Sequence, residues 1–263
     1  MSNNDFYVGL AADYDRMILW ERRLKTERPW FDGLWSRFGT RSVLDASCGT
    51  GHHLVMFAGM GLDVWGSDAS GEMIRLARQT ARSAGLHMDE RICHCDWNDL
   101  TKTMPRLFDA VLCIGNSLPY VIEHEMLAAS LAGMWSRVAD GGFLLLQFKN
   151  YLKLYSTRQR FLPLSSSSEP YESVALRMCE YHPDMVDFHV ILLDKRGGGW
   201  SLRHQSTPLK PYTPEDIAPL LHSLGAQTAL HGALSLAPFD PGVSEDIVML
   251  ALKLPEIAQG GRE

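Results

Sequence analysis

Short apolar runs alternate with amphipathic stretches through residues 41–150 of the chain. The apolar runs are typical of buried strands, and the stretches between them repeat their apolar positions with the period of a helix. We expect strands at 42–46, 62–67, 91–95, 110–114 and 142–148, and helices at 51–59, 71–84 and 123–138. This order predicts an α/β fold with a Rossmann-like, doubly wound and mostly parallel sheet.

The pattern changes on both sides of this region. Residues 13–38 carry apolar positions at helical spacing, and we expect Pro29 to break that helix. Downstream, three runs separated by turn residues predict an antiparallel β-meander, whose strands lie at 173–179, 186–194 and 200–206. A helix to residue 224 is signalled by a cap at Thr213, and two further strands at 228–236 and 247–252 complete a sheet of seven.

These patterns divide the chain into four parts. An N-terminal helical cap covers 1–40, and the core covers 41–150 and 207–254, with the inserted antiparallel meander of 151–206 as a lid over the substrate. The serine tract at 165–168 is expected to be a mobile loop within that insertion, and 255–263 a flexible tail.

Composition and charge narrow the class of protein. Hydrophobic residues make up 46% and charged residues 21% of the 263 residues, which suits a folded globular domain. The net charge of -6 has the wrong sign for a nucleic-acid partner. The apolar runs are too short to span a membrane and no signal pattern is present, so we expect a cytoplasmic protein without a membrane partner. Five scattered cysteines indicate reduced thiols.

The strongest local signal is the strand at 43–46, which runs into a turn containing Gly49 and Gly51 and then into a helix. Such a turn lets a ligand approach the backbone, and Asp68, nineteen residues past Gly49, stands where a carboxylate binds a ribose. Both S-adenosylmethionine and a nicotinamide dinucleotide fit this framework. Leu54 replaces the third glycine of the dinucleotide fingerprint, and Asp45 near the turn suits an ammonium group better than a pyrophosphate.

Four segments, at 45–51, 67–73, 95–97 and 108–117, resemble the successive motifs of class I S-adenosylmethionine-dependent methyltransferases. The Gly-Asn-Ser at 115–117 and the Lys-Asn-Tyr at 149–151 are similar to those of the glycine/sarcosine N-methyltransferase family. The resemblance implies an enzyme that transfers a methyl group from S-adenosyl-L-methionine to a small-molecule acceptor, with an amine nitrogen favoured, and that could form a homo-oligomer.

The resemblance also implies roles around the cofactor. Asp68 would hold the ribose, Met73 would pack on the adenine, and Arg23 would pair with the cofactor carboxylate. Asp96 and Trp97 would contact the amino edge and one face of the adenine. The whole set expected at the cofactor is Tyr7, Tyr14, Arg23, Asp45, Ser47, Gly49, Gly51, Asp68, Ala69, Met73, Asp96, Trp97, Ile114 and Asn116.

On the acceptor side, Asn116, Tyr120 and Lys149 are the expected catalytic residues, acting as positioning groups since an amine only has to arrive neutral. Tyr171, Arg203 and His204 are expected to join them in binding the substrate. Lys149 stands where the family has an arginine. A lysine keeps the charge but loses the bidentate fork that recognises a carboxylate, so a larger acceptor, or one that is not an amino acid, stays open beside glycine.

Other interpretations also remain open. A small-molecule O- or S-methyltransferase, a non-catalytic S-adenosylmethionine-binding protein and a nicotinamide oxidoreductase share most of these features. Cys93 and Cys95 flank His94 without a second pair at zinc spacing, so no metal is expected. His52 and His53 open the helix after the glycine turn, where a pair on the helix surface is favoured and an approach of one of them to the cofactor stays open.

Overall fold

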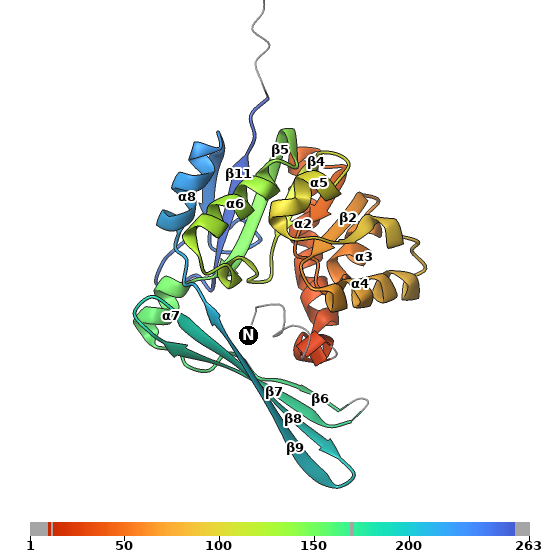
Figure 1. Cartoon of the computed structure of the whole chain (residues 1–263), viewed down its shortest axis with the longest axis vertical. Coiled ribbons are helices and arrows are strands. Elements are labelled where there is room, and N and C mark those ends of the chain that lie inside the picture. The colour runs from red at the N-terminus through yellow and green to blue at the C-terminus, as the bar shows by residue number, and fades with distance from the viewer. Residues whose placement is uncertain (1–9, 12, 169–170, 256–263) are drawn as a thin grey trace, which may run out of the picture.

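The computed structural model describes residues 10–11, 13–168 and 171–255, which form two β-sheets with helices around the larger one (Figure 1). The larger sheet has seven strands in the order β10-β11-β5-β4-β1-β2-β3. All neighbouring pairs are parallel except those of β11, which runs antiparallel to both β5 and β10. Its strands are β1 (Ser42–Asp45), β2 (Asp63–Asp68), β3 (Ile92–His94), β4 (Phe108–Cys113), β5 (Val138–Lys149), β10 (Gln227–His231) and β11 (Asp246–Leu252). The predicted Rossmann-like fold is confirmed.

Helices cover both faces of this sheet because its central strands are apolar on both sides. Against one face pack α2 (Trp20–Phe38), α3 (His52–Ala58) and α4 (Gly71–Ser83). Against the other pack α5 (Leu100–Thr103), α6 (His124–Trp135) and α8 (Pro214–Ser223). With both faces covered by helices, the loops that follow the parallel strands lie at the carboxyl edge of the sheet. Sheets of this type bind ligands at that edge.

Helix ends follow the capping signals of the sequence. The Ser70 hydroxyl accepts a 3.4 Å hydrogen bond from the Met73 N–H, and so caps α4. Thr213 and Asp216 form a reciprocal capping box at the start of α8. Both predicted starts are confirmed.

The prediction that Pro29 breaks the first helical segment is wrong. The interruption lies at residues 18–19, and α2 runs through Pro29 to Phe38. Pro29 and Lys25, whose carbonyl loses its helical donor, both lie on the exposed side of α2, where solvent satisfies that carbonyl. The buried face of α2, which includes Phe31 and Trp35, keeps the helix on the sheet.

The inserted segment forms a separate antiparallel sheet, here called the small sheet. It contains β6 (Ser165–Ser167), β7 (Ser173–Tyr181), β8 (Val186–Arg196) and β9 (Gly199–Leu209), in that order, and follows α7 (Tyr151–Thr157). The meander is therefore confirmed, with one more strand than predicted. The serine tract is not a loop, because Ser165 pairs with Ala175 of β7 and donates a buried 2.7 Å hydrogen bond to the Met17 carbonyl.

Two boundaries in the larger sheet also differ from the prediction. The helix predicted to end at 138 ends at Trp135, and β5 begins at Val138, with a register shift against β4. The strand predicted over 228–236 stops at His231. Of the predicted tail, only Pro255 is within the described residues.

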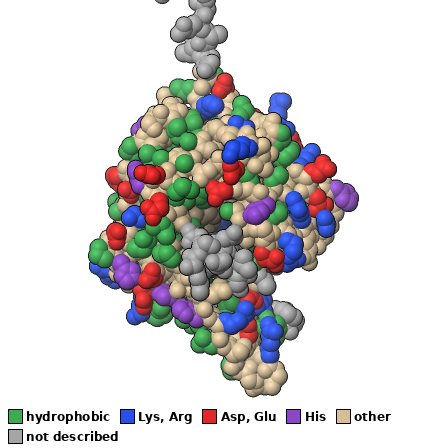
Figure 2. Space-filling view, in the orientation of Figure 1, with side chains coloured by type: hydrophobic (Ala, Val, Ile, Leu, Met, Phe, Trp, Pro, Cys, Tyr) green, Lys and Arg blue, Asp and Glu red, His purple; other side chains and the backbone are tan. Residues whose placement is uncertain are grey.

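The small sheet lies beyond the carboxyl edge of the larger sheet, since β5 runs directly into α7 and then into β6 (Figure 1). It is attached by an apolar cluster in which Leu10 and Met17 pack on Ala175, Val190 and Leu192. On the face shown in Figure 2, acidic and basic side chains are interspersed. No helix within the described residues has the length and apolar character of a membrane span.

Candidate functional site

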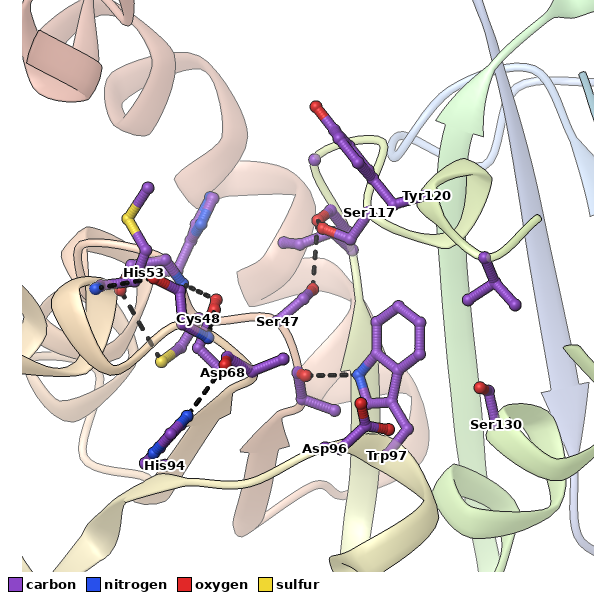
Figure 3. A pocket seen from close by; sticks show the side chains of 18 of the residues that line it. Ser47, Cys48, His53, Asp68, His94, Asp96, Trp97, Ser117, Tyr120 and Ser130 are labelled. Carbon is purple, nitrogen blue, oxygen red and sulfur yellow. Dashed lines mark hydrogen bonds between the residues drawn. The ribbon is translucent and has the colours of Figure 1, made fainter. Parts of the chain in front are cut away.

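A cavity of about 620 Å³ opens at the carboxyl edge of the larger sheet. Its walls come from the turns after β1, β2, β3 and β4, together with α2 and α6, and Figure 3 shows Asp68 and His94 on one side and Trp97 and Ser130 on the other. The lining residues are Tyr14, Trp20, Arg23, Ala46, Ser47, Cys48, Gly49, His53, Asp68, Ala69, Ser70, Met73, His94, Asp96, Trp97, Ile114, Gly115, Ser117, Tyr120, Val121, Ile122, Glu123, Met126 and Ser130.

Asp68 ends β2 with its carboxylate held by two backbone N–H groups. Oδ2 accepts from the Gly49 N–H and Oδ1 from the Ser70 N–H, each over 2.9 Å. Burial raises the pKa of this carboxyl. The two hydrogen bonds favour the charged form and lower the pKa, but their effect is smaller than that of burial. Each oxygen keeps a second lone pair, so the group is oriented to accept the two hydroxyl hydrogens of a ribose.

The glycine turn that supplies one of these donors needs its glycines. Gly49 and Gly51 have φ values of +52° and +84°, and Gly51 begins α3. A Cβ on Gly51 would lie 2.9 Å from the Cα of Ala77, because α4 crosses the turn at that point. Gly49 lines the cavity, whereas Gly51, the N-cap of α3, does not, and its predicted cofactor contact stays a prediction.

Asp45, at the end of β1, is buried behind this turn and does not line the cavity. Burial raises its pKa to about 7, although the Ser47 N–H donates to Oδ1 over 3.2 Å. The charge of Asp68 raises it further. Near neutral pH this carboxyl titrates beneath the cavity floor.

Trp97 is fixed by its indole N–H, which donates to the Ala46 carbonyl over 2.6 Å. Its backbone is pressed against α6, since a Cβ on Gly133 would lie 2.1 Å from the Trp97 carbonyl oxygen. Asp96 caps the short 3-10 turn of 97–99 through the Asn98 N–H. Two of the residues predicted for the adenine are thus held rigidly on the cavity wall.

His53 lines the cavity and is buried, so the prediction of a surface pair with His52 is wrong for this residue. Its Nε2 lies 2.7 Å from Glu27 Oε2, and Arg23 donates from Nε to the other Glu27 oxygen over 2.9 Å. Burial lowers the pKa of His53. Burial raises the pKa of Glu27, but the hydrogen bond from His53 and the charge of Arg23 outweigh this effect, so that the pKa of Glu27 is lowered. No local signal could reveal this pairing, because Glu27 lies on α2, which reaches α3 only in the fold.

A second wall follows β4 and was not predicted beyond Tyr120. It combines hydroxyl groups with apolar side chains and one carboxylate, and its residues are Ser117, Tyr120, Val121, Ile122, Glu123, Met126 and Ser130. Ser117 ends the Gly-Asn-Ser motif, Val121 and Ile122 form a short apolar pair, and the other residues carry no motif. This wall extends the cavity beyond the residues expected to hold a cofactor.

Asn116 and Lys149 do not line the cavity. Asn116 has a φ of +69°, and its side-chain oxygen accepts from the Lys149 N–H over 2.9 Å, while Nδ2 lies 3.3 Å from the Tyr151 hydroxyl. The Lys149 ammonium is 2.7 Å from Asp246 Oδ1 on the adjacent strand. These contacts join the end of β4 to the end of β5, and the roles predicted for both residues in catalysis stay predictions.

The three substrate residues predicted in the insertion also lie off the cavity wall. Arg203 forms ion pairs with Asp13 and Asp194, the second over 2.7 Å. The Tyr171 ring is covered by the guanidinium groups of Arg16 and Arg196, and His204 stacks on His189. Arg203 thus ties the small sheet to the helical residues 10–11 and 13–17 ahead of α2, here called the N-terminal helix. Tyr7 lies outside the described residues.

The other predicted cofactor residues are brought together. Those on the cavity wall are Tyr14, Arg23, Ser47, Gly49, Asp68, Ala69, Met73, Asp96, Trp97 and Ile114. In the part of the chain that the structure describes, no three His, Cys, Asp or Glu side chains gather as metal ligands.

Comparison with known proteins shows what part of this chain is similar to. Residues 43–142 match the family described as "Methyltransferase domain". The chain is 32% identical over 148 residues to a glycine/sarcosine N-methyltransferase of Aphanothece halophytica, which covers 56% of this chain and 55% of that protein. It is 32% identical over 165 residues to the glycine N-methyltransferase of Oryctolagus cuniculus, with 57% and 55% covered. The chain spans about half the length of these relatives.

Solved structures share the fold over almost the whole chain. An S-adenosylmethionine-dependent methyltransferase from Clostridium acetobutylicum superposes with a TM-score of 0.75 at 20% identity, covering 96% of this chain and 98% of that one. The S-adenosylmethionine-bound amino pentose methyltransferase CalS10 from Micromonospora echinaspora superposes with a TM-score of 0.68 at 22% identity, covering 92% and 96%. Residues 43–142 thus match a methyltransferase domain, and the solved structures share the fold of the chain.

Proposed function

We propose that this protein transfers a methyl group from S-adenosylmethionine to the nitrogen of a small-molecule amine. The observation that carries the proposal is the Asp68 carboxylate, which two backbone N–H groups hold at one end of the cavity. The second wall, which follows β4, contains none of the predicted cofactor residues. Such a cavity has room for an adenosine at one end and an acceptor at the other. The N-methyltransferase names of the relatives support the choice of acceptor atom.

The cofactor side of the cavity fits the proposal residue by residue. Asp68 would accept from the ribose hydroxyls, and the fixed indole of Trp97 would lie against the adenine. The Nε–H of Arg23 donates a hydrogen bond to Glu27. The two Nη groups of Arg23 would therefore donate to the carboxylate of the cofactor. His53 binds the other oxygen of Glu27, so the carboxylate that positions Arg23 is itself held in place.

The chain's own contribution to the reaction is alignment and exclusion of water. When bound, S-adenosylmethionine supplies an electrophilic methyl group on a sulfonium, which a nucleophile displaces in line. The turn after β4 and the second wall would hold the acceptor nitrogen on that line, and the small sheet would serve as the lid. A neutral amine needs no base in the transition state, because its proton leaves after the bond to carbon has formed.

The N-methyltransferase names of the relatives favour an amine over a hydroxyl or a thiol. An alcohol would need a base to accept its proton, and the lining groups that could supply one include His53, which Glu27 holds, and the Glu123 carboxylate. Burial raises the pKa of Tyr14, so its phenol stays protonated at neutral pH. The CalS10 relative, named an amino pentose methyltransferase, adds amino sugars to the amines worth testing.

The experiment is methyl transfer from isotopically labelled S-adenosylmethionine into a fractionated amine, amino-acid and amino-sugar extract, read by mass spectrometry. We expect a product labelled on nitrogen, and no product from the Asp68→Ala variant. A label found only on oxygen or sulfur would show that the acceptor is an alcohol or a thiol and not an amine, which would contradict the proposed acceptor class. Tight binding of the cofactor without any labelled product would overturn the proposed activity.

A further inference from the structure

Arg177 of β7 lies on the face of the small sheet that packs against the rest of the protein. It stands opposite Val190 of β8 in an antiparallel pair, and directly opposed residues share a face. Val190 is fully buried in the cluster that contains Leu10 and Met17 of the N-terminal helix. The Arg177 side chain therefore emerges toward the N-terminal helix and not toward open solvent.

The same face borders the cavity. Tyr14 and Tyr120 pack against the cluster that contains Val190, as does Phe188 of β8, and both tyrosines also line the cavity. The charges of Arg23 and Arg177 both act on the Tyr14 hydroxyl, whose pKa burial raises and these two guanidinium groups lower. Arg177 does not itself line the cavity, but it lies on the face of the small sheet against which two tyrosines of the cavity wall pack.

Arg177 differs from its neighbours in having no acidic partner among the described residues. Its Nη2 donates to the Pro163 carbonyl over 2.8 Å, while its buried Nε has no hydrogen-bond partner. By contrast, Arg203 is paired with Asp13 and Asp194. A partly buried cation without a counter-ion is costly, and burial lowers the pKa of Arg177 accordingly. An anionic ligand would remove that cost.

The other cations near the cavity are already neutralised. Lys149, which stands where the family has its carboxylate-binding arginine, is paired with Asp246. Arg23 forms an ion pair with Glu27, and it lines the cavity where the carboxylate of the cofactor is expected. Among the described residues around the site, Arg177 is the cation that has neither an acidic partner nor a role in the proposed cofactor complex.

We propose that Arg177 binds a carboxylate of the methyl acceptor, which makes the substrate an amine that also carries a carboxylate and places its anchor in the small sheet instead of at position 149. This inference rests on the proposed function. A carboxylate would accept from the guanidinium donors that Pro163 leaves free. Binding of the acceptor would then draw the small sheet against the cavity, because the anchor belongs to β7 and the methyl donor to the larger sheet.

The test uses the full chain saturated with S-adenosylhomocysteine and measures dissociation constants by calorimetry. The probes are glycine, β-alanine and 4-aminobutyrate, with ethylamine and butylamine as amines that lack the carboxylate. We expect at least one of the amino acids to bind, and Arg177→Gln to weaken it by about 10- to 100-fold, the effect of losing a charge-assisted hydrogen bond. Arg177→Lys should recover part of that loss.

Arg160→Gln is the matched control, since Arg160 lies in the same insertion but is exposed and paired with Glu180. It should bind every probe like the unchanged protein. A measurement without any variant compares 4-aminobutyrate with its methyl ester, and the ester is expected to bind at least about tenfold more weakly. That comparison stands even where Arg177→Gln fails to fold.

Each of the following binding results would overturn the inference: no amino-acid probe binds, Arg177→Gln binds them within about twofold of the unchanged protein, or the variant loses affinity for S-adenosylmethionine instead. The last result would assign Arg177 to the cofactor carboxylate. Failure of the proposed function is a separate outcome, seen as Arg177-dependent binding without methyl transfer. Conversely, methyl transfer to an amine without a carboxylate, unaffected by Arg177→Gln, would refute the anchor and leave the function standing.

Discussion

The backbone N–H of Gly49 donates a 2.9 Å hydrogen bond to the Asp68 carboxylate, which joins the turn after β1 to the end of β2. This contact links the glycine turn to the acidic residue nineteen positions later, the pairing on which the sequence-based prediction of an adenosine cofactor rests. The turn orients the carboxylate before any ligand arrives, so little ordering remains to oppose binding.

Replacement of Asp68 by Asn is expected to raise the dissociation constant of S-adenosylmethionine by about 10- to 100-fold, since an amide accepts from one ribose hydroxyl at most. The free energy of unfolding should fall by about 1–3 kcal/mol, because the amide nitrogen cannot accept from one of the two backbone N–H groups that the carboxylate satisfies. Calorimetric titration measures the affinity. Asp99→Asn, at an exposed carboxylate paired with Lys102, is the control and should bind normally.

Gly51 and Gly61 provide a matched pair, because both have a φ of +84° but only Gly51 is crowded. Gly61→Ala should cost about 1–2 kcal/mol in the free energy of unfolding, the strain of a left-handed alanine. Gly51→Ala should cost at least about 1 kcal/mol more, since its Cβ meets the backbone of Ala77. Urea unfolding measures both, and equal losses would contradict the close approach of α4.

Asp45 should make stability fall as pH rises. Its pKa is about 7 in the folded protein and near 3.8 when unfolded, so the unfolded chain loses this proton first and folding is penalised increasingly between about pH 4 and pH 7. At about 1.4 kcal/mol per pKa unit, the free energy of unfolding of Asp45→Asn relative to the unchanged protein should rise by about 3 kcal/mol from pH 5 to pH 8. A difference that does not change with pH would refute the buried titration.

Arg203 is expected to act on stability more than on substrate binding. Its guanidinium is about half exposed, but the carboxylates of Asp13 and Asp194 that it bridges are buried. Arg203→Gln should therefore cost about 1–3 kcal/mol of unfolding free energy, less than for a fully buried pair. Leu202→Gln, at an exposed neighbour in β9, should cost under about 0.5 kcal/mol. A raised KM for the acceptor with unchanged stability would instead restore the predicted substrate role.

The sequence predicted the larger sheet well because each of its strands and covering helices carries its own apolar pattern. The cofactor wall was predicted for a related reason: its residues follow consecutive strands, and the carboxyl ends of parallel strands meet at one edge. Local signals suffice where a local pattern and a simple topology together fix the position of a side chain.

Predictions failed where a residue's environment depends on a distant segment. Ser165 has no apolar alternation, and it is a strand residue because β7 and the Met17 carbonyl supply its partners. His53 is polar, and its burial follows from Glu27 on another helix. Arg203 is an isolated charge in an exposed strand, and its partner Asp13 lies 190 residues away.

Titration of the purified protein with S-adenosylmethionine and, in parallel, with NAD⁺ tests the central claim most directly. The cavity at Asp68 predicts one S-adenosylmethionine bound per chain, about 10- to 100-fold weaker binding in Asp68→Asn, and no measurable binding of NAD⁺. Binding of NAD⁺ without binding of S-adenosylmethionine would contradict the assignment of the cavity and every function proposed from it.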